Sequence, residues 1–223
     1  MSKGLSKGLI ALIVIGCLLF VGLIGVVGVA SMVKGKYNVA TQKTVACDKA
    51  WGTVQAVYQR RYDLIPNLVK IVEGAANFEK STLVQVTQAR ASVGQIKMVA
   101  GTTPGGAPTT ESDLENFSAR QQTLGTALSR LMVVMERYPE LRATQQFADL
   151  SAQLEGTENR ISVARMDYNE AIGSYNVFIR SWIIPMVSLK MFGWAERPMF
   201  QIQTPEAENA PAVNFDSLKP TAN

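Results

Sequence analysis

The sequence predicts an all-α protein in which a single N-terminal transmembrane helix is followed by an antiparallel, coiled-coil-like four-helix bundle. Two observations carry this prediction. A run of 26 residues near the N-terminus lacks any charged side chain, and beyond it apolar residues recur at alternating spacings of three and four up to about residue 182. The first pattern is typical of a membrane span. The second is typical of helices that pack lengthwise around a shared core.

The uncharged run lies between Lys7 and Lys34 and is expected to form a transmembrane helix over about 9–33, preceded by a short tail over 1–8. At ~1.5 Å per residue the run reaches ~39 Å, whereas a hydrocarbon core is ~30 Å thick. A lipoprotein leader cleaved before Cys17 is the alternative. Length favours an uncleaved anchor, because apolar sequence continues for 16 residues beyond Cys17 and a secretory apolar region spans only ~7 to 15.

Small residues recur every three positions inside the predicted span. They are Gly22, Gly25, Gly28 and Ser31. Ridges of small side chains let transmembrane helices approach one another closely, although glycine is also common in transmembrane helices that do not associate. We therefore hypothesise that the protein assembles into homo-oligomers through this ridge.

The basic excess of the chain flanks the membrane span. The net charge is +4, yet the part of the chain beyond residue 49 holds 16 basic and 17 acidic residues. A nearly neutral body argues against a nucleic-acid partner. Lys34 and Lys36 are placed to meet lipid headgroups, which makes the bilayer the expected partner. Lys34, Lys36 and Lys43 follow the span closely, against Lys3 and Lys7 before it, and this excess of one favours a cytoplasmic body.

The inventory of reactive side chains is poor. The chain has no histidine and two cysteines, Cys17 and Cys47, which are too far apart along a helix to pair. Without histidine, the common nucleophile–base pairs and zinc ligand sets are excluded. No phosphate-binding glycine motif occurs either. We expect no enzyme activity, no cofactor and no metal.

The bundle is expected to occupy 37–182 as four helices over about 37–61, 64–99, 113–138 and 139–182. Asp63 is expected to cap the second helix, with Pro66 in its first turn. If this junction is only a kink, three passes result instead of four. The expected core positions of the third helix are Leu114, Phe117, Gln121, Leu124, Leu128, Leu131 and Met135, and those of the fourth include Ala164, Tyr168, Ala171, Tyr175 and Phe178.

Two strings of the bundle are long enough to be specific. They are RRYDLIPNLV, which contains Arg60, Arg61, Asp63, Pro66 and Asn67, and LEGTENR, which ends at Arg160. With further matches over about 37–200, they resemble the LemA family of bacterial membrane proteins. The resemblance implies a single transmembrane helix and an antiparallel helical bundle in the bacterial cell (inner) membrane, without established enzymatic activity. It also implies kinship with magnetosome-associated proteins that are linked to membrane formation.

Most distinctive residues of these strings have a structural interpretation. Arg60, Arg61 and Asp63 could form an intersubunit contact, but charge pairing at a helix junction is the commoner explanation. The pairs Tyr168-Asn169 and Tyr175-Asn176 lie seven residues apart and share one helix face. We expect the rings to fill the core and the asparagines to fix helix register through polar contacts.

An apolar segment over 183–200, too short to span a bilayer, is rich in tryptophan, phenylalanine and methionine. With four passes it begins near the membrane, so that Trp182, Phe192 and Trp194 are expected at the interface with Lys34 and Lys36. The tail over 201–223 contains prolines without periodicity and is expected to be disordered or a short docking peptide.

These inferences predict a non-enzymatic, membrane-anchored scaffold that self-assembles and organises or remodels the membrane. The alternative is an adaptor that presents its bundle to a membrane protease or an envelope-stress system, an idea suggested by the family resemblance.

Overall fold

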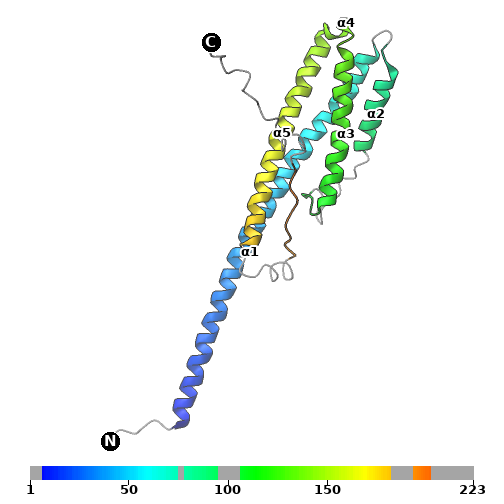
Figure 1. Cartoon of the computed structure of the whole chain (residues 1–223). Helices are drawn as coiled ribbons and strands as arrows, with labels where there is room; N and C mark the ends of the chain where they lie inside the picture. Colours follow the sequence, from blue (N-terminus) through cyan, green and yellow to red (C-terminus); the bar gives the residue numbers. More distant parts are fainter. Residues whose placement is uncertain (1–6, 75–77, 95–105, 182–192, 202–223) are drawn as a thin grey trace, which may run out of the picture.

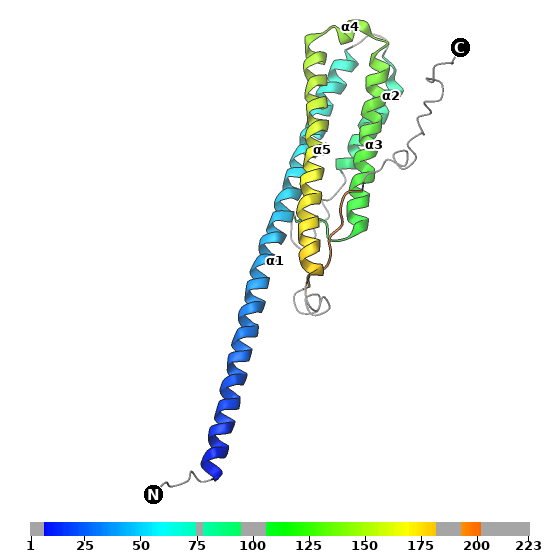
Figure 2. The ribbon, with the colours of Figure 1, turned by 60° about the vertical axis from the view of Figure 1, so that its left-hand side comes forward.

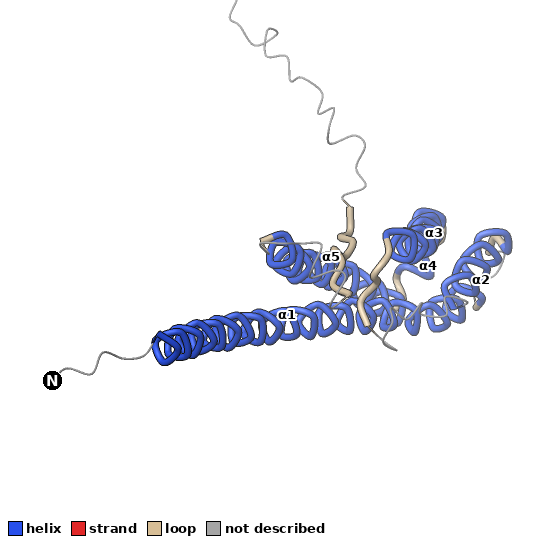
Figure 3. Tube along the Cα trace, turned by 90° about the horizontal axis from the view of Figure 1, so that it is seen from below, coloured by secondary structure: helices blue, strands red, loops and turns tan. Residues whose placement is uncertain are grey.

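The structure is a computed structural model that describes residues 7–74, 78–94, 106–181 and 193–201 (Figure 1). All regular secondary structure in these ranges is α-helical, and one long apolar helix precedes a helical bundle. The predicted fold class is therefore confirmed. In the view from below, the other helices lie on one side of the long helix (Figure 3).

The long helix α1 runs without interruption over Lys7–Glu73, which is 67 residues or ~100 Å at the ordinary helical rise. Its N-terminal part includes a window of mean hydropathy 2.4 of which no residue is buried, as a membrane span requires. The same helix then enters the bundle as its first pass (Figure 1). The predicted start of a separate bundle helix near residue 37 is wrong, because the span and the bundle share one helix.

The predicted break at Asp63 is also wrong. Asp63 Oδ1 accepts a hydrogen bond from Gln59 Nε2 at 2.7 Å, and Pro66 lies inside α1. A proline in a helix interior costs about 3 kcal/mol. Ile65 and Leu68 on either side of it are fully buried, and each buried side chain of this size contributes about 1.5–3 kcal/mol. Burial of this stripe keeps the helix continuous through the proline.

The chain reverses after Glu73, whereas the sequence predicted a continuous helix over about 64–99. The remaining helices are α2 (Lys80–Gly94), α3 (Glu111–Met135), the short α4 (Pro139–Arg142) and α5 (Gln145–Arg180). The fourth predicted helix is thus interrupted, since Thr144 accepts a hydrogen bond from Phe147 N and caps α5. Four long helical passes remain among the described residues, and α5 returns to the end of the bundle from which the span emerges (Figure 2).

The four passes pack mainly as two pairs, α1 with α5 and α2 with α3. Two hydrophobic clusters fill the interior. The membrane-distal cluster includes Ile65, Leu68, Val86, Leu124, Leu131 and Leu154. The membrane-proximal cluster includes Cys47, Trp51, Tyr58, Phe117, Ile161, Tyr168 and Phe200.

A layer of buried polar residues separates the two clusters. It consists of Arg61 on α1, Gln121 on α3 and Thr157 on α5, which are exposed by 4, 6 and 1%. Each of the three occupies the core position between a member of the proximal cluster and a member of the distal cluster on its own helix. Polar residues at such core positions can fix the register of packed helices.

Candidate functional site: a polar groove and a C-terminal strap

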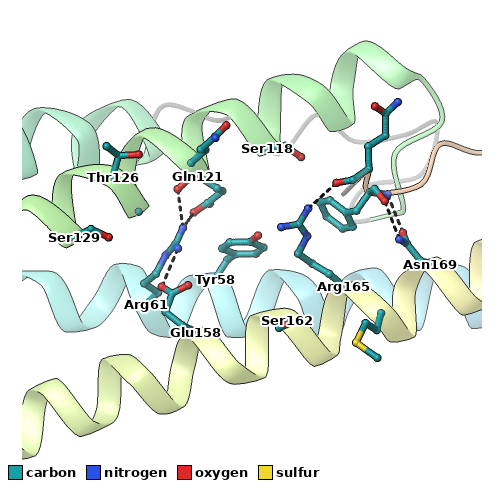
Figure 4. Close-up of a pocket in the computed structure, with 15 residues that line it drawn as sticks. Tyr58, Arg61, Ser118, Gln121, Thr126, Ser129, Glu158, Ser162, Arg165 and Asn169 are labelled. Atoms are coloured by element: carbon teal, nitrogen blue, oxygen red, sulfur yellow. Dashed lines mark hydrogen bonds and ion pairs between the residues drawn. The ribbon is translucent and has the colours of Figure 1, made fainter. Parts of the chain in front are cut away.

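A groove of about 680 Å³ lies between α3 and α5. Its floor is the part of α1 that carries Tyr58 and Arg61, and Figure 4 shows side chains of all three helices converging on it. The groove exists because α3 packs chiefly on α2 and α5 packs chiefly on α1, which leaves the space between the two pairs open.

Arg61 is the buried cation of this groove. Its Nη1 lies 3.0 Å from Glu158 Oε1, and its Nη2 donates to the Gln121 carbonyl at 3.1 Å and to Gln121 Oε1. Its Nε is buried and has no hydrogen-bond partner within the described ranges. The guanidinium also lies over the Tyr58 ring, with Cζ 5.0 Å from the ring centroid. Burial raises the pKa of the Tyr58 hydroxyl, so this group stays neutral at physiological pH.

Arg165 is the second cation of the groove and is only half-buried. Its Nη2 lies 3.4 Å from the Gln201 carbonyl, and its Cζ is 4.6 Å from the centroid of the Phe200 ring. Among the described residues, no carboxylate lies within ion-pair distance of Arg165. The groove therefore holds two cations, of which only Arg61 is paired.

The rest of the groove is lined by small hydroxyl-bearing side chains. They are Ser118, Thr126, Ser129 and Ser162. Within the part of the chain that the structure describes, none of these hydroxyls hydrogen-bonds to another protein group, so they are free to bond a ligand or water. A groove of hydroxyls and guanidinium groups suits an anionic, polar ligand better than an apolar one.

The membrane-proximal end of the groove is closed by an extended segment, residues 193–201, which we call the strap. It runs between α5 and α3 in both ribbon views (Figures 1 and 2). Gly193 begins it with φ of +68°, a left-handed conformation that glycine adopts without the penalty of a side chain.

Two asparagines of α5 hold the strap by its main chain. The Asn169 amide donates to the Phe200 carbonyl at 2.9 Å and accepts from Phe200 N at 2.8 Å. The Asn176 amide makes the same pair of bonds to Arg197, both at 2.9 Å. The Tyr168 hydroxyl donates to the Pro198 carbonyl at 3.1 Å. The Tyr-Asn pairs therefore bind an extended peptide along a helix, in addition to the predicted filling of the core by the rings.

Side chains of the strap add contacts to the proximal cluster. Phe200 is buried against Trp51 and Tyr168, with ring centroids at 6.3 and 5.3 Å. Arg197 Nη1 lies 2.9 Å from Asp48 Oδ1 on α1. Burial among these groups raises the pKa of the Tyr168 hydroxyl. The expectation that all of 183–200 lies in the membrane interface is therefore wrong for its last residues, which run along the bundle.

The strap begins at the membrane end of the bundle. The rings of Trp194 and Tyr37 lie 5.5 Å apart, and Lys36 Nζ lies 5.7 Å from the centroid of the Phe178 ring on α5. Lys34 follows the span and is exposed. These positions put three of the predicted interface residues at the end of the bundle that faces the span. Trp182 and Phe192 lie outside the described residues, as do 202–223 of the predicted tail.

The predicted association ridge is open in the single chain. A methyl group added at Gly22, Gly25 or Gly28 would meet no atom within 4 Å from the rest of the described chain, apart from the neighbouring backbone of its own helix. The Ser31 hydroxyl donates to the Val27 carbonyl at 2.8 Å. Cys17 in the span is exposed, whereas Cys47 in the bundle is buried.

Of the predicted helix-junction residues, the structure brings Arg61 into the groove, while Arg60, Asp63 and Asn67 are exposed on other faces of α1. Glu158, from the LEGTENR string, and Asn169, from the first Tyr-Asn pair, also line the groove, although neither was predicted to belong to a binding site. Arg165 carried no signal in the sequence that singled it out. A signal was present for the layer itself, since Gln121 interrupts an otherwise apolar stripe of α3.

The described groups of this site are suited to binding a ligand through hydrogen bonds and charge. Within the described ranges no group of three His, Cys, Asp or Glu side chains is placed to hold a metal ion. The groove instead offers guanidinium groups, hydroxyls and amides, and the strap shows how the asparagines of α5 hold a main chain.

The fold and the site define a membrane-associated helical-bundle protein with a peptide strap and a polar groove. The model of the LemA family matches residues 50–215, most of the chain. The chain therefore belongs to the LemA family, as its motifs predicted.

Curated relatives include two magnetosome proteins of Paramagnetospirillum magneticum, MamQ 1 and MamQ 2. Each is 25% identical over 184 residues, which cover 74% of this chain and 65% of the relative. The magnetosome protein MamQ of Magnetospirillum gryphiswaldense is 34% identical over 58 residues, 26% of this chain and 21% of the relative. The match thus spans about 65% of the length of the first two relatives. Neither the family description nor these names states a reaction.

Proposed function

We propose that this protein is a non-enzymatic scaffold of the bacterial inner membrane, which self-assembles into oligomers and organises the membrane that carries it. The observation that supports this most is the continuity of α1, which enters the bundle from the apolar segment without a loop or a hinge. The tilt of the span then sets the orientation of the bundle. Copies that associate in the bilayer would hold their bundles side by side in a fixed array.

The open ridge of the span supplies a surface for such association. Close approach of two helices in lipid depends on small residues, and within the described ranges no side chain lies near the Cβ positions of Gly22, Gly25 and Gly28. The naming of the relatives as magnetosome proteins is compatible with a role in membrane organisation. The excess of lysines after the span favours a bundle on the cytoplasmic side.

Crosslinking through Cys17 in native membranes tests self-assembly. Cys17 is exposed in the span and Cys47 is buried, so a membrane-permeant oxidant or bismaleimide reports on the span. We expect a covalent dimer that disappears in the Cys17→Ser variant. Monomer alone, together with a monomeric mass in mild detergent, would contradict the proposal.

A pair of substitutions separates a specific contact from random collision. Gly25→Leu adds bulk to the ridge at a position where the Cβ has open space around it among the described residues. Ala30→Leu adds bulk on the opposite side of the same helix, about 140° away at 100° per residue. We expect Gly25→Leu to reduce the Cys17 crosslink strongly and Ala30→Leu to leave it unchanged. Equal effects would mean that the ridge is not the contact.

The adaptor function remains a second candidate, and the polar groove favours it because it offers a surface to a partner segment. The two functions differ in what purification yields. A scaffold gives large particles of one chain, whereas an adaptor gives a single copy that co-purifies with a membrane protease.

A further inference from the structure

The strap delivers the rest of the chain to the mouth of the groove. Arg197 is bonded to Asn176 and Phe200 to Asn169, so the strap runs along α5 toward the N-terminus of that helix, which is the direction of the groove. Phe200 and Gln201 themselves line the groove. Whatever follows Gln201 starts at this site.

The groove presents a positive charge at the place where the strap ends. Arg165 bonds to the Gln201 carbonyl and has no carboxylate partner among the described residues. Arg61 lies further along the groove and shares one carboxylate, Glu158, whose side chain is half exposed. The unpaired groups of the lining therefore favour an anionic segment with hydrogen-bond acceptors.

The sequence that follows the strap has this composition. Residues 202–223 contain Glu206, Glu208 and Asp216 against one basic residue, Lys219. Extended chain covers at most ~3.3 Å per residue, so Glu206 and Glu208 lie within ~16 and ~23 Å of Gln201. Along α5 the groove extends from Asn169 to Glu158, which is ~16 Å at 1.5 Å per residue. The two nearest carboxylates of the tail, Glu206 and Glu208, can therefore reach along the whole length of the groove.

We propose that the groove between α3 and α5 is a docking site for an acidic, extended peptide, and that its occupant is the tail of the same chain, beginning at residue 202. The asparagines hold the main chain up to Phe200. Arg165, the second cation Arg61 and the serine hydroxyls bind the segment that carries Glu206 and Glu208. The tail then covers the buried polar layer of the bundle.

Binding of a synthetic peptide to the full-length protein tests this proposal. The probe is a fluorescent peptide of residues 202–223, and the readout is its anisotropy with the protein in detergent micelles. In the wild-type chain the attached tail competes at an effective concentration that is ~mM for a short tether. The double variant Glu206→Lys/Glu208→Lys has a tail that no longer fits, so we expect it to bind the peptide at least about tenfold more tightly than wild type.

Charge substitutions in the groove locate the binding. In the double-variant background, Arg165→Glu is expected to weaken binding of the peptide by about tenfold or more, as for loss of a charge-assisted contact. Because Arg165 also contacts the strap, Ser162→Glu serves as a second variant that adds a negative charge without removing a strap contact. Arg160→Glu is the matched control. It makes the same charge change on α5, at a residue that lines a different hollow with Arg60.

A charge-reversed peptide completes the test. A peptide with lysine at positions 206 and 208 is expected to prefer the Arg165→Glu protein over the Arg165 protein, the reverse of the original peptide. Equal affinity of the wild-type and double-variant proteins for the original peptide would overturn the proposal, because the tail would then not occupy the groove. Equal weakening by Arg165→Glu and Arg160→Glu would also overturn it. The outcome is independent of the Cys17 crosslink that tests self-assembly.

Discussion

The two hydrophobic clusters of the bundle are built on the same helices and closed in different ways. The membrane-distal cluster, with Leu68 and Leu131 at its centre, is covered by the helix α2. The membrane-proximal cluster, with Trp51 and Tyr168 at its centre, is covered by the strap. Burial of apolar stripes on regular helices is sufficient to close the distal cluster. Closure of the proximal cluster depends on side-chain amides that bond to the main chain of one extended segment.

This difference predicts unequal stability. Where a helix covers the distal cluster, the stabilising free energy comes from many buried side chains. The strap over the proximal cluster is held by a few hydrogen bonds of about 1 kcal/mol each and by one buried ring. Local opening follows the least stable element. We therefore expect the proximal half to open first, and opening there would uncover aromatic surface close to the membrane.

The largest effect is expected from a substitution in the distal half. Leu68 is fully buried, and Leu68→Ala is expected to lower the free energy of unfolding by about 3 kcal/mol, through lost burial and the cavity left behind. Val133→Ala on the exposed face of α3 is the control, with an expected change below about 0.5 kcal/mol. Denaturant unfolding followed by circular dichroism measures both. Similar losses for the two variants would mean that the distal cluster is not packed as described.

Substitutions in the polar layer between the two clusters are expected to lower the free energy of unfolding by less. Arg61→Ala removes the bonds to Glu158 and Gln121, and because Glu158 remains half exposed we expect a loss of about 2 kcal/mol. Arg61→Met keeps most of the buried volume and is expected to lose about half as much. Unfolding of both variants by denaturant checks this order. An equal loss for methionine and alanine would show that the bonds matter more than the volume.

The strap itself can be tested through the buried thiol that it helps to cover. Burial raises the pKa of Cys47, so alkylation of this thiol should be slow in the folded protein. Asn169→Ala removes two bonds to the strap and is expected to accelerate alkylation about tenfold, equivalent to about 1.4 kcal/mol of local stability. The measurement uses a Cys17→Ser background. Asn159→Ala, at an exposed position of the same helix, should leave the rate unchanged. An increase there would argue against the role of Asn169 in holding the strap.

The smallest effect concerns pH at the start of the strap. The hydrogen bond from Arg180 lowers the pKa of the Glu196 carboxyl. The folded pKa of Glu196 lies below the unfolded value of about 4.3. The contribution of its interaction with Arg180 to folding stability is therefore present at neutral pH and is lost as the pH falls through the folded pKa. The melting temperature of the wild type should therefore lie slightly above that of Glu196→Gln at pH 7. The difference should shrink as the pH falls below the unfolded pKa and should vanish once the pH is below the folded pKa. A difference that persists in acid would mean that the charge is not responsible.

The contrast between the halves also explains what could be predicted from sequence. Every expected core residue of α3 is buried, namely Leu114, Phe117, Gln121, Leu124, Leu128, Leu131 and Met135. On α5 the expected Ala164, Tyr168 and Tyr175 are buried, but Ile172 and Ile179 are buried in place of the expected Ala171 and Phe178. The helical repeat of 3.6 drifts from a strict seven-residue pattern over a helix of this length.

Two features escaped prediction for physical reasons. Pro66 is a strong local signal for a helix start, but the buried stripe on both sides of it outweighs the local cost. The strap has no periodicity of its own, since an extended segment bound through its main chain imposes little on its side chains. Asn169 and Asn176 were recognised as a repeated pair on one face, yet their partner lies 21 to 31 residues further along the chain. Only the structure reveals that pairing.

Single-particle images of the full-length protein in lipid nanodiscs test the central claim most directly. If α1 is a rigid link and the spans associate, each particle should show several helical rods of equal height that stand side by side on one face of the bilayer. One rod per particle, at orientations that vary relative to the bilayer, would contradict both the rigid link and the proposed assembly.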